Sequence, residues 1–258
     1  MGSRSALPLL VVVALAALFA MSYAASARQR AEIQPQVTTA PSTSLAAAPP
    51  PRAPKPRVMG IHRMAVLRGF VPLRARPNGR VLARAGASTE FGGTRVLSVA
   101  ARRGPWLGVV ATELPNGRLA WVNRRNPALH LRRTAYSLHA DLSGRWLELR
   151  RHGRRIRRIT VAVGRPGSET PTGRFAVTDK LNGRRYGSYY GCCVLALSGH
   201  QEHLPPGWRG GDRLAIHGTD SVATIGDAGS AGCLRAADAD MRVLMGRVPL
   251  GTPVFITD

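Results

Sequence analysis

The sequence predicts a mainly β protein in two folded parts, with very little helix. Short β-rich runs separated by evenly spaced turn signals occupy residues 58–131, and longer strands follow over 134–258. Only one short helix is indicated, at 237–245. Hydrophobic residues make up 44% of the 258, so the chain can bury a core rather than remain a disordered polyelectrolyte.

The first 27 residues have the pattern of an export signal. Arg4 precedes an apolar run over 7–20, a small-residue site lies at 25–27, and no further charge occurs before Arg28. A basic start, an apolar stretch and a small-residue site are typical of a secretory signal peptide. An uncleaved membrane anchor is the alternative, because about 20 uncharged residues can span a bilayer. Either reading predicts an extracytoplasmic protein, in the cell wall or periplasm.

Residues 28–57 form the next segment and are rich in Pro, Ala, Ser and Thr. Such a composition cannot bury a core, and it is typical of an extended, semi-rigid linker. We therefore expect the folded part to begin at residue 58, held away from the membrane or the cleavage site.

The segment 58–131 is predicted to form a small β-barrel or sandwich. Its turn signals separate candidate strands at 70–73, 94–99, 106–110 and 119–122. A late strand containing Trp121 and Val122 follows the turn at 116–118, and in this the segment resembles a bacterial SH3-like domain. We read Trp106 and Trp121 as core aromatics rather than as a platform for a ligand.

Longer strands are predicted after residue 134. A turn at His152 and Gly153 joins 146–151 to 156–163 in a candidate β-hairpin. Further strands are predicted at 174–178, 194–197, 213–217 and 253–257. The helix at 237–245 would come soon after the cysteine-containing turn that carries the candidate chemistry.

That turn is 230–235, Ser-Ala-Gly-Cys-Leu-Arg, and its Cys233 is the candidate nucleophile. The small residues before it leave room for a substrate carbonyl, and the N–H groups of Gly232 and Cys233 could form an oxyanion hole. A free thiol is mostly protonated at neutral pH, so it needs a base. His217, at the end of the apolar strand 214–217, is the candidate base, and we expect their pairing to lower the pKa of the thiol.

His217-Gly218-Thr219 followed by 230–235 resembles the L,D-transpeptidase (YkuD-type) family. The segments 163–175 and 250–256 also match the family's pattern, so that the resemblance covers about 134–258. It implies a β-sandwich-like catalytic domain, with a short helix after the nucleophile, that acts on peptidoglycan stem peptides.

The resemblance also implies residue roles. Cys233 would be the nucleophile, His217 the proton acceptor and donor, and the Gly218 carbonyl would orient the imidazole. Arg235 would hold a stem-peptide carboxylate, with an ion pair inside the fold as the alternative, and Ser230 would fix the turn by hydrogen bonding.

One position departs from the family. Many members carry a second histidine before the Gly-Cys pair, where this chain has Ala231. Cys192 and Cys193 are also unusual, since neighbouring cysteines rarely form a disulfide, although that pairing stays open.

Other candidates near the motifs are weaker. Tyr186, Tyr189 and Tyr190 could line a substrate cleft or be ordinary core and surface tyrosines. A metal site at His200 and His203 is a further hypothesis; the expected chemistry needs neither a metal nor an organic cofactor.

The expected reaction begins with attack on the carbonyl that joins a stem-peptide diamino acid to D-alanine. A thioester forms, and an amine of a second stem captures the acyl group in a 3→3 cross-link. Two alternatives stay open: an L,D-carboxypeptidase or endopeptidase with water as acceptor, or a non-catalytic wall-binding protein.

The net charge of +23 indicates an anionic partner. Aromatic residues make up only 5% and do not alternate with basic ones, which disfavours nucleic acid. Together with the export signal, this favours anionic cell-wall polymers, while the N-terminus could also anchor the chain to the membrane.

Overall fold

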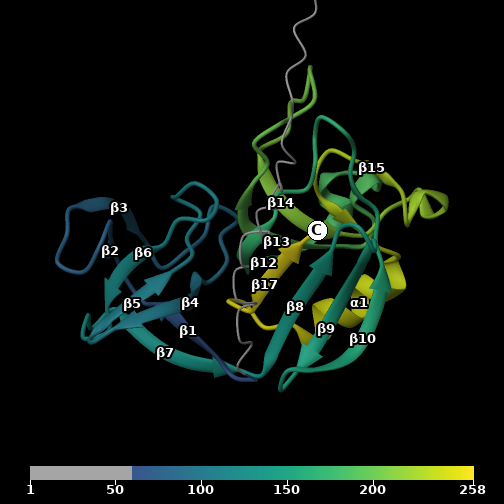
Figure 1. Cartoon of the computed structure of the whole chain (residues 1–258). Helices are drawn as coiled ribbons and strands as arrows, with labels where there is room; N and C mark the ends of the chain where they lie inside the picture. The colour runs from purple at the N-terminus through teal and green to yellow at the C-terminus, as the bar shows by residue number, and fades with distance from the viewer. Residues whose placement is uncertain (1–59) are drawn as a thin grey trace, which may run out of the picture. The chain divides into compact units, whose positions relative to one another are not determined.

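The computed structural model describes residues 60–258, which belong to one compact unit (Figure 1). The predicted signal peptide at 1–27 and the linker at 28–57 lie outside the described residues. Within 60–258, no helix is both long enough and apolar enough to cross a membrane.

The N-terminal sheet has seven strands, all paired antiparallel. They are β1 (His62–Leu67), β2 (Val71–Arg74), β3 (Val81–Ala85), β4 (Val96–Arg103), β5 (Trp106–Val109), β6 (Ala120–Asn123) and β7 (Leu129–Thr134). Their order across the sheet is β3-β2-β6-β5-β4-β1-β7. Alternate residues on several strands, such as Ala65 and Leu67 on β1, point into one apolar core.

The C-terminal sheet has eight strands in the order β10-β9-β8-β17-β12-β13-β14-β16. They are β8 (Tyr136–Asp141), β9 (Trp146–Arg151), β10 (Arg154–Thr160), β12 (Gly173–Asn182), β13 (Cys193–His200), β14 (Arg213–His217), β16 (Leu234–Arg235) and β17 (Pro253–Thr257). The pairs β8–β17 and β14–β16 are parallel, and the others are antiparallel. A separate two-stranded parallel sheet joins β11 (Val163–Gly164) to β15 (Ala228–Ser230).

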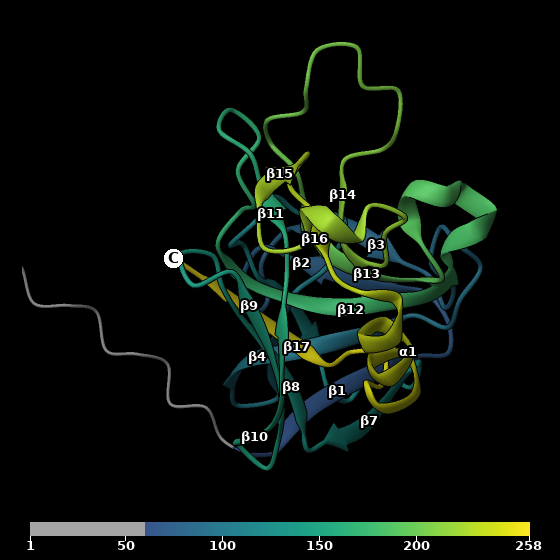
Figure 2. The same cartoon turned by 90° about the vertical axis from the view of Figure 1, so that its right-hand side faces the viewer.

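The only α-helix of residues 60–258 is α1 (Asp238–Arg247), seen beside the C-terminal sheet in Figures 1 and 2. Its Met241 and Leu244 are fully buried and belong to the same apolar core as Phe175, Leu195 and Ile216 of the sheet. The helix therefore covers one face of the sheet and closes its core.

One strand pairing and one loop position the candidate site. The parallel pairing of β14 with β16 sets His217 opposite Arg235 and Ile216 opposite Leu234. The connection between β13 and β14 is a long loop, which extends beyond the end of β14 in Figure 2. Both ends of this loop, at His200 and Arg213, are hydrogen-bonded or paired to other parts of the fold.

The prediction of a mainly β chain with one short helix is confirmed. Six strands had not been predicted, namely β1, β3, β7, β8 and the two short strands β15 and β16. The SH3-like nature of the N-terminal sheet stays a prediction.

Candidate active site

His217 is the last residue of β14, and its side chain is fully buried. Its Nδ1 lies 2.6 Å from the Gly218 carbonyl oxygen. Because a carbonyl can only accept, Nδ1 must carry the proton and donate it. Nε2 is then the unprotonated nitrogen, and it has no hydrogen-bond partner among the described residues. This is the tautomer that a general base requires.

Cys233 lies between β15 and β16 and directly precedes Leu234, the residue opposite Ile216. It is half-buried and is the only one of the three cysteines that is not in a disulfide. Cys233 and His217 line the same small cavity, of about 20 Å³. The fold thus brings together the two residues predicted to be the nucleophile and its base.

Burial makes both members of this pair neutral. It raises the pKa of the Cys233 thiol to about 11, against the opposing effects of a backbone hydrogen bond from Ala215 and the charge of Arg235. It also lowers the pKa of His217 to about 4, to which the positive charge of Arg235 contributes. The expectation of a thiol pKa below its usual range is therefore wrong, because desolvation by burial is the largest influence on this thiol. A nucleophilic attack from this neutral state would require the proton to leave sulfur at the same time.

Ser230 fixes the turn that carries the nucleophile. Its Oγ donates to the Cys233 carbonyl oxygen at 2.6 Å and accepts from the Gly232 N–H at 3.0 Å. The second bond contradicts the prediction that the Gly232 N–H is an oxyanion donor, because that N–H is already occupied. The Cys233 N–H has no hydrogen-bond partner within residues 60–258 and is still available for this role.

Sequence reasoning missed Gln201, which lies in the β13–β14 loop and is buried. Its Nε2 lies 3.2 Å from the Ser168 carbonyl oxygen, 3.0 Å from that of Glu169 and 3.0 Å from that of Ala231. Gly232 has a φ of +111°, and a Cβ there would collide with the Gln201 amide. Gln201 thus connects the nucleophile's turn to the segment after β11, and no local sequence pattern marks it.

Arg235 is buried at 6% exposure, yet it forms no ion pair within residues 60–258. Its guanidinium carbon lies 5.7 Å from the centre of the Tyr189 ring, and its Nε has no partner. The alternative of an ion pair inside the fold is therefore not found. A buried charge without a partner is energetically costly. The buried guanidinium of Arg235 can therefore bind an incoming carboxylate, to which it would donate hydrogen bonds.

The comparisons with known proteins cover the same part of the chain as this site. Residues 135–256 match the model of the YkuD L,D-transpeptidase catalytic domain. This YkuD-matching domain includes His217, Cys233 and Arg235, and all strands of the C-terminal sheet up to part of β17.

Two curated Bacillus proteins are similar to the YkuD-matching domain; both are named YkuD and assigned provisionally to the L,D-transpeptidases. That of Bacillus licheniformis is 33% identical over 124 residues, 47% of this chain and 66% of its own. That of Bacillus subtilis is 32% identical over 121 residues, 47% of this chain and 65% of its own. The chain thus spans slightly under two thirds of each relative.

Among solved structures, an Enterococcus faecium L,D-transpeptidase mutant is 20% identical to this chain. The similarity covers 47% of this chain and 49% of that one, with a TM-score of 0.36.

Two tyrosines of the YkuD-matching domain pack beside the base. The ring centres of Tyr189 and Tyr190 lie 5.4 Å and 4.9 Å from that of His217. Both residues line the cavity of Cys233, whereas Tyr186 is 51% exposed and does not line it. Of the three candidate cleft tyrosines, the structure therefore places two at the site.

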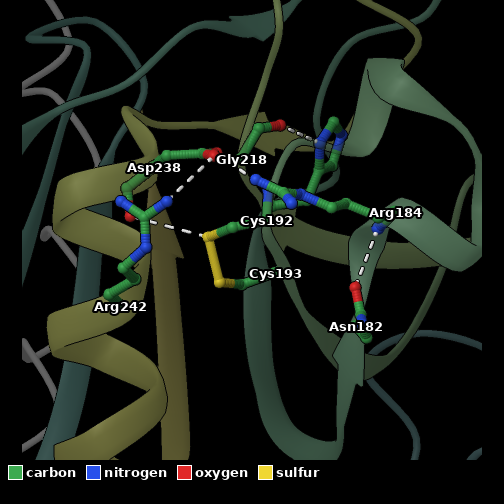
Figure 3. The surroundings of a disulfide bond; sticks show 8 residues. Asn182, Arg184, Cys192, Cys193, Gly218, Asp238 and Arg242 are labelled. Carbon is green, nitrogen blue, oxygen red and sulfur yellow. Dashed lines mark hydrogen bonds and ion pairs between the residues drawn. A yellow bond between two sulfur atoms is a disulfide. The ribbon is translucent and has the colours of Figure 1, made fainter.

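Cys192 and Cys193 form a vicinal disulfide (Figure 3). The Cys192 N–H donates to Asp238 Oδ1 of α1 at 2.9 Å. The Cys193 carbonyl oxygen accepts from the Gly218 N–H at 3.0 Å. Gly218 therefore donates to the disulfide segment through its N–H and orients His217 through its carbonyl.

The metal hypothesis for His200 and His203 is wrong. The His200 Nε2 donates to the Thr112 carbonyl oxygen at 2.8 Å, and its Nδ1 lies 2.9 Å from Asp212 Oδ2, so both ring nitrogens are occupied. No group of three or more potential metal-binding side chains occurs in residues 60–258.

His200 instead connects the site to the N-terminal sheet. Asn116, in the loop after β5, donates from Nδ2 to the His200 carbonyl oxygen at 2.7 Å and accepts the His200 N–H at 2.9 Å. The next residue is Gln201, so the N-terminal sheet holds the residue adjacent to the one that contacts the nucleophile's turn.

Proposed function

We propose that this chain is an exported peptidoglycan L,D-transpeptidase that uses Cys233 as nucleophile and forms 3→3 cross-links. The main supporting observation is the unpartnered Nε2 of the neutral, buried His217, which lines the same cavity as Cys233. The matched family model supports the class of reaction.

The first half-reaction begins when Cys233 Sγ attacks the carbonyl carbon that joins the stem-peptide diamino acid to its terminal D-alanine. The sulfur's proton moves to His217 Nε2, and the resulting oxyanion accepts the Cys233 N–H. The C–N bond then breaks, and the imidazolium gives its proton to the departing amine. Free D-alanine is released, and the acyl group stays on Cys233 as a thioester.

The second half-reaction transfers the acyl group. An amine of a second stem attacks the thioester carbonyl while His217 Nε2 takes a proton from it. The C–S bond then breaks, and His217 gives this proton to the sulfur, which restores the Cys233 thiol and the neutral imidazole. The Gly218 carbonyl stabilises the imidazolium that forms in both half-reactions, because it accepts the Nδ1 proton throughout.

Arg235 binds a carboxylate of the donor stem, since its buried guanidinium has no acidic partner among the described residues. Tyr189 and Tyr190 cover the base and exclude water from its neighbourhood. The net charge of +23 favours residence on anionic polymers of the cell envelope.

Incubation of the purified protein with tetrapeptide stems, followed by mass analysis, tests this proposal. A cross-linked dimer together with free D-alanine is expected, and Cys233→Ala should yield neither. Tripeptide without dimer would indicate an L,D-carboxypeptidase or endopeptidase, and an unchanged substrate would indicate a non-catalytic wall-binding protein.

A further inference from the structure

The N-terminal sheet contains a cavity of about 360 Å³ whose lining is dominated by arginine. The seven lining residues are Arg63, Arg102, Leu107, Arg124, Leu131, Arg132 and Arg133. None of the seven is acidic. The site already described lies in the C-terminal sheet and shares no residue with this cavity.

Strand pairing shows how the arginines come together. Arg63 lies directly opposite Arg133 in the β1–β7 ladder, and Arg102 lies opposite Leu107 in the β4–β5 ladder. Arg63 is two residues before Ala65, which points into the apolar core, so it continues the core-facing side of β1 beyond the core. All five arginines are exposed, whereas Leu107 belongs to the apolar core.

The local sequence cannot neutralise this charge. Residues 60–134 contain 14 arginines and only two acidic residues, Glu90 and Glu113. Glu113 pairs with Arg95, and Glu90 pairs with Arg213 of the C-terminal sheet. The five arginines of the cavity form no ion pair with any described residue.

Like charges directly opposite each other on paired strands destabilise a sheet. Here Arg63 and Arg133 are such a pair, and three further guanidinium groups share their cavity. We propose that this arginine cavity is a binding site for phosphate groups, and that its ligand is a polymer carrying phosphates along its chain.

The chemistry of the cavity favours phosphate and a polymer. One guanidinium group can bind two oxygens of a phosphate through two parallel hydrogen bonds. Several guanidinium groups around one recess can therefore hold consecutive phosphates of a chain. A bilayer surface would be recognised by a flatter site with inserting apolar side chains, whereas Leu131, 41% exposed, is the only exposed apolar residue of the lining. This inference does not depend on the thiol chemistry proposed above.

The test compares two double variants of the full chain that remove equal charge. Arg63→Gln with Arg133→Gln changes the cavity. Arg84→Gln with Arg118→Gln is the matched control, because both arginines are exposed, on β3 and in the β5–β6 loop of the N-terminal part, and neither lines the arginine cavity. Titration calorimetry with long-chain polyphosphate at several salt concentrations measures the affinity of each protein.

We expect the cavity variant to lose affinity on the order of tenfold or more, as removal of two arginine contacts to an anionic surface implies. Its binding should also become less dependent on salt, because fewer counterions are released. The control variant should lose less than about threefold, since screened surface charges contribute little. Equal losses in both variants would show diffuse attraction to the net charge and would overturn the proposal.

Two further arms address the class of ligand. Polyglutamate of similar length should bind more weakly than polyphosphate, and equal binding would overturn the preference for phosphate. Binding to phosphatidylglycerol vesicles without binding to soluble polyphosphate would overturn the assignment of a polymer.

A stability measurement separates loss of the site from loss of the fold. Without polyphosphate, the cavity variant should melt at the same temperature as wild type or higher, because a repulsive pair has been removed. Polyphosphate should raise the melting temperature of wild type more than that of the cavity variant. A cavity variant that melts lower and is stabilised equally would contradict the proposal. Carbapenem acylation of Cys233 should be unchanged in both variants, which separates this test from that of the proposed function.

Discussion

At the scale of single residues, the site is a neutral thiol beside a neutral imidazole. Burial raises the pKa of Cys233 to about 11 and lowers that of His217 to about 4. Over the range between these values the dominant form keeps the proton on sulfur and a lone pair on Nε2. In the proposed mechanism, His217 therefore takes the proton during the attack itself, and a preformed thiolate is not needed.

This arrangement predicts the pH dependence of acylation by a carbapenem. The rate should be flat around neutrality and fall as pH drops through about 4, where His217 gains a proton. His217→Ala should cost on the order of 10²-fold or more near neutrality. Its residual rate should rise with pH toward about 11, where the thiol itself ionises. Stopped-flow measurements across pH test this; a midpoint below the ordinary thiol pKa, lost in the variant, would indicate a stable ion pair instead.

The same shift links His217 to folding stability. Because its pKa is lowered on folding, the unfolded chain binds the proton first as pH falls from 6.5 towards about 4. The contribution of His217 to the free energy of unfolding is thus fully present above pH 6.5, and it is lost as the pH falls from 6.5 to about 4.

Gln201 is predicted to position the nucleophile's turn. Gln201→Met keeps the approximate shape but removes the amide that reaches the Ala231 carbonyl oxygen. We expect acylation to slow by about tenfold to 10²-fold, since small misplacements of reacting groups have such effects. The midpoint of the pH profile should stay near that of wild type, because His217 keeps its own contacts. His203→Gln, at an exposed neighbour, is the matched control. An unchanged rate in Gln201→Met would show that the amide is not needed there.

At the scale of elements, sequence patterns located the strands that have clear turns or alternation. The predicted hairpin at 146–163 corresponds to β9 and β10, and the predicted helix at 237–245 to α1. The missed strand β7 (Leu129–Thr134) has four consecutive exposed residues, so it lacks the alternation that marks a half-buried strand. His217 and Cys233 could be singled out as candidates because each belongs to a short local motif. Gln201 could not, since its partners lie about 30 residues away in sequence.

The segment that contains the vicinal disulfide gives a prediction about thiol counts. Unreduced, denatured protein should take up one alkylating group, on Cys233, because Cys192 and Cys193 are paired. After reduction it should take up three. Intact mass and peptide mapping measure both values. Three groups without reduction would show that the pair is a dithiol, and labelling of Cys192 or Cys193 by a carbapenem would contradict the assignment of Cys233.

At the scale of the whole molecule, the two sheets are connected by buried contacts. Thr89 of the N-terminal part donates to Asp179 Oδ1 at 2.5 Å, and both residues are buried. Met64, Val66 and Val96 pack together with Leu250 of the C-terminal part. Because of these contacts and the Asn116–His200 hydrogen bonds, we expect the N-terminal sheet to support the structure of the site.

Removal of residues 58–131 should therefore reduce turnover on soluble stem peptides as well as on intact cell walls. The physical reason is that Asp179 would lose its hydrogen bond, Leu250 would be exposed, and His200 would lose Asn116. Asn116→Ala in the full chain is the finer test, since it leaves the sheet in place and should still slow acylation measurably. Full activity on soluble peptides, with loss only on walls, would show that the N-terminal sheet serves targeting alone.

The contacts of the Gln201 amide have one more consequence, for how the turn that carries Cys233 responds to its surroundings. Its contacts to Ser168, Glu169 and Ala231 join an uncharged donor to uncharged acceptors. Salt does not screen such bonds, and none of these groups gains or loses a proton within the biological pH range. The turn that carries Cys233 should thus keep its shape in dilute or saline surroundings alike. Acid near pH 4 can protonate His217, but it should not change the position of Cys233.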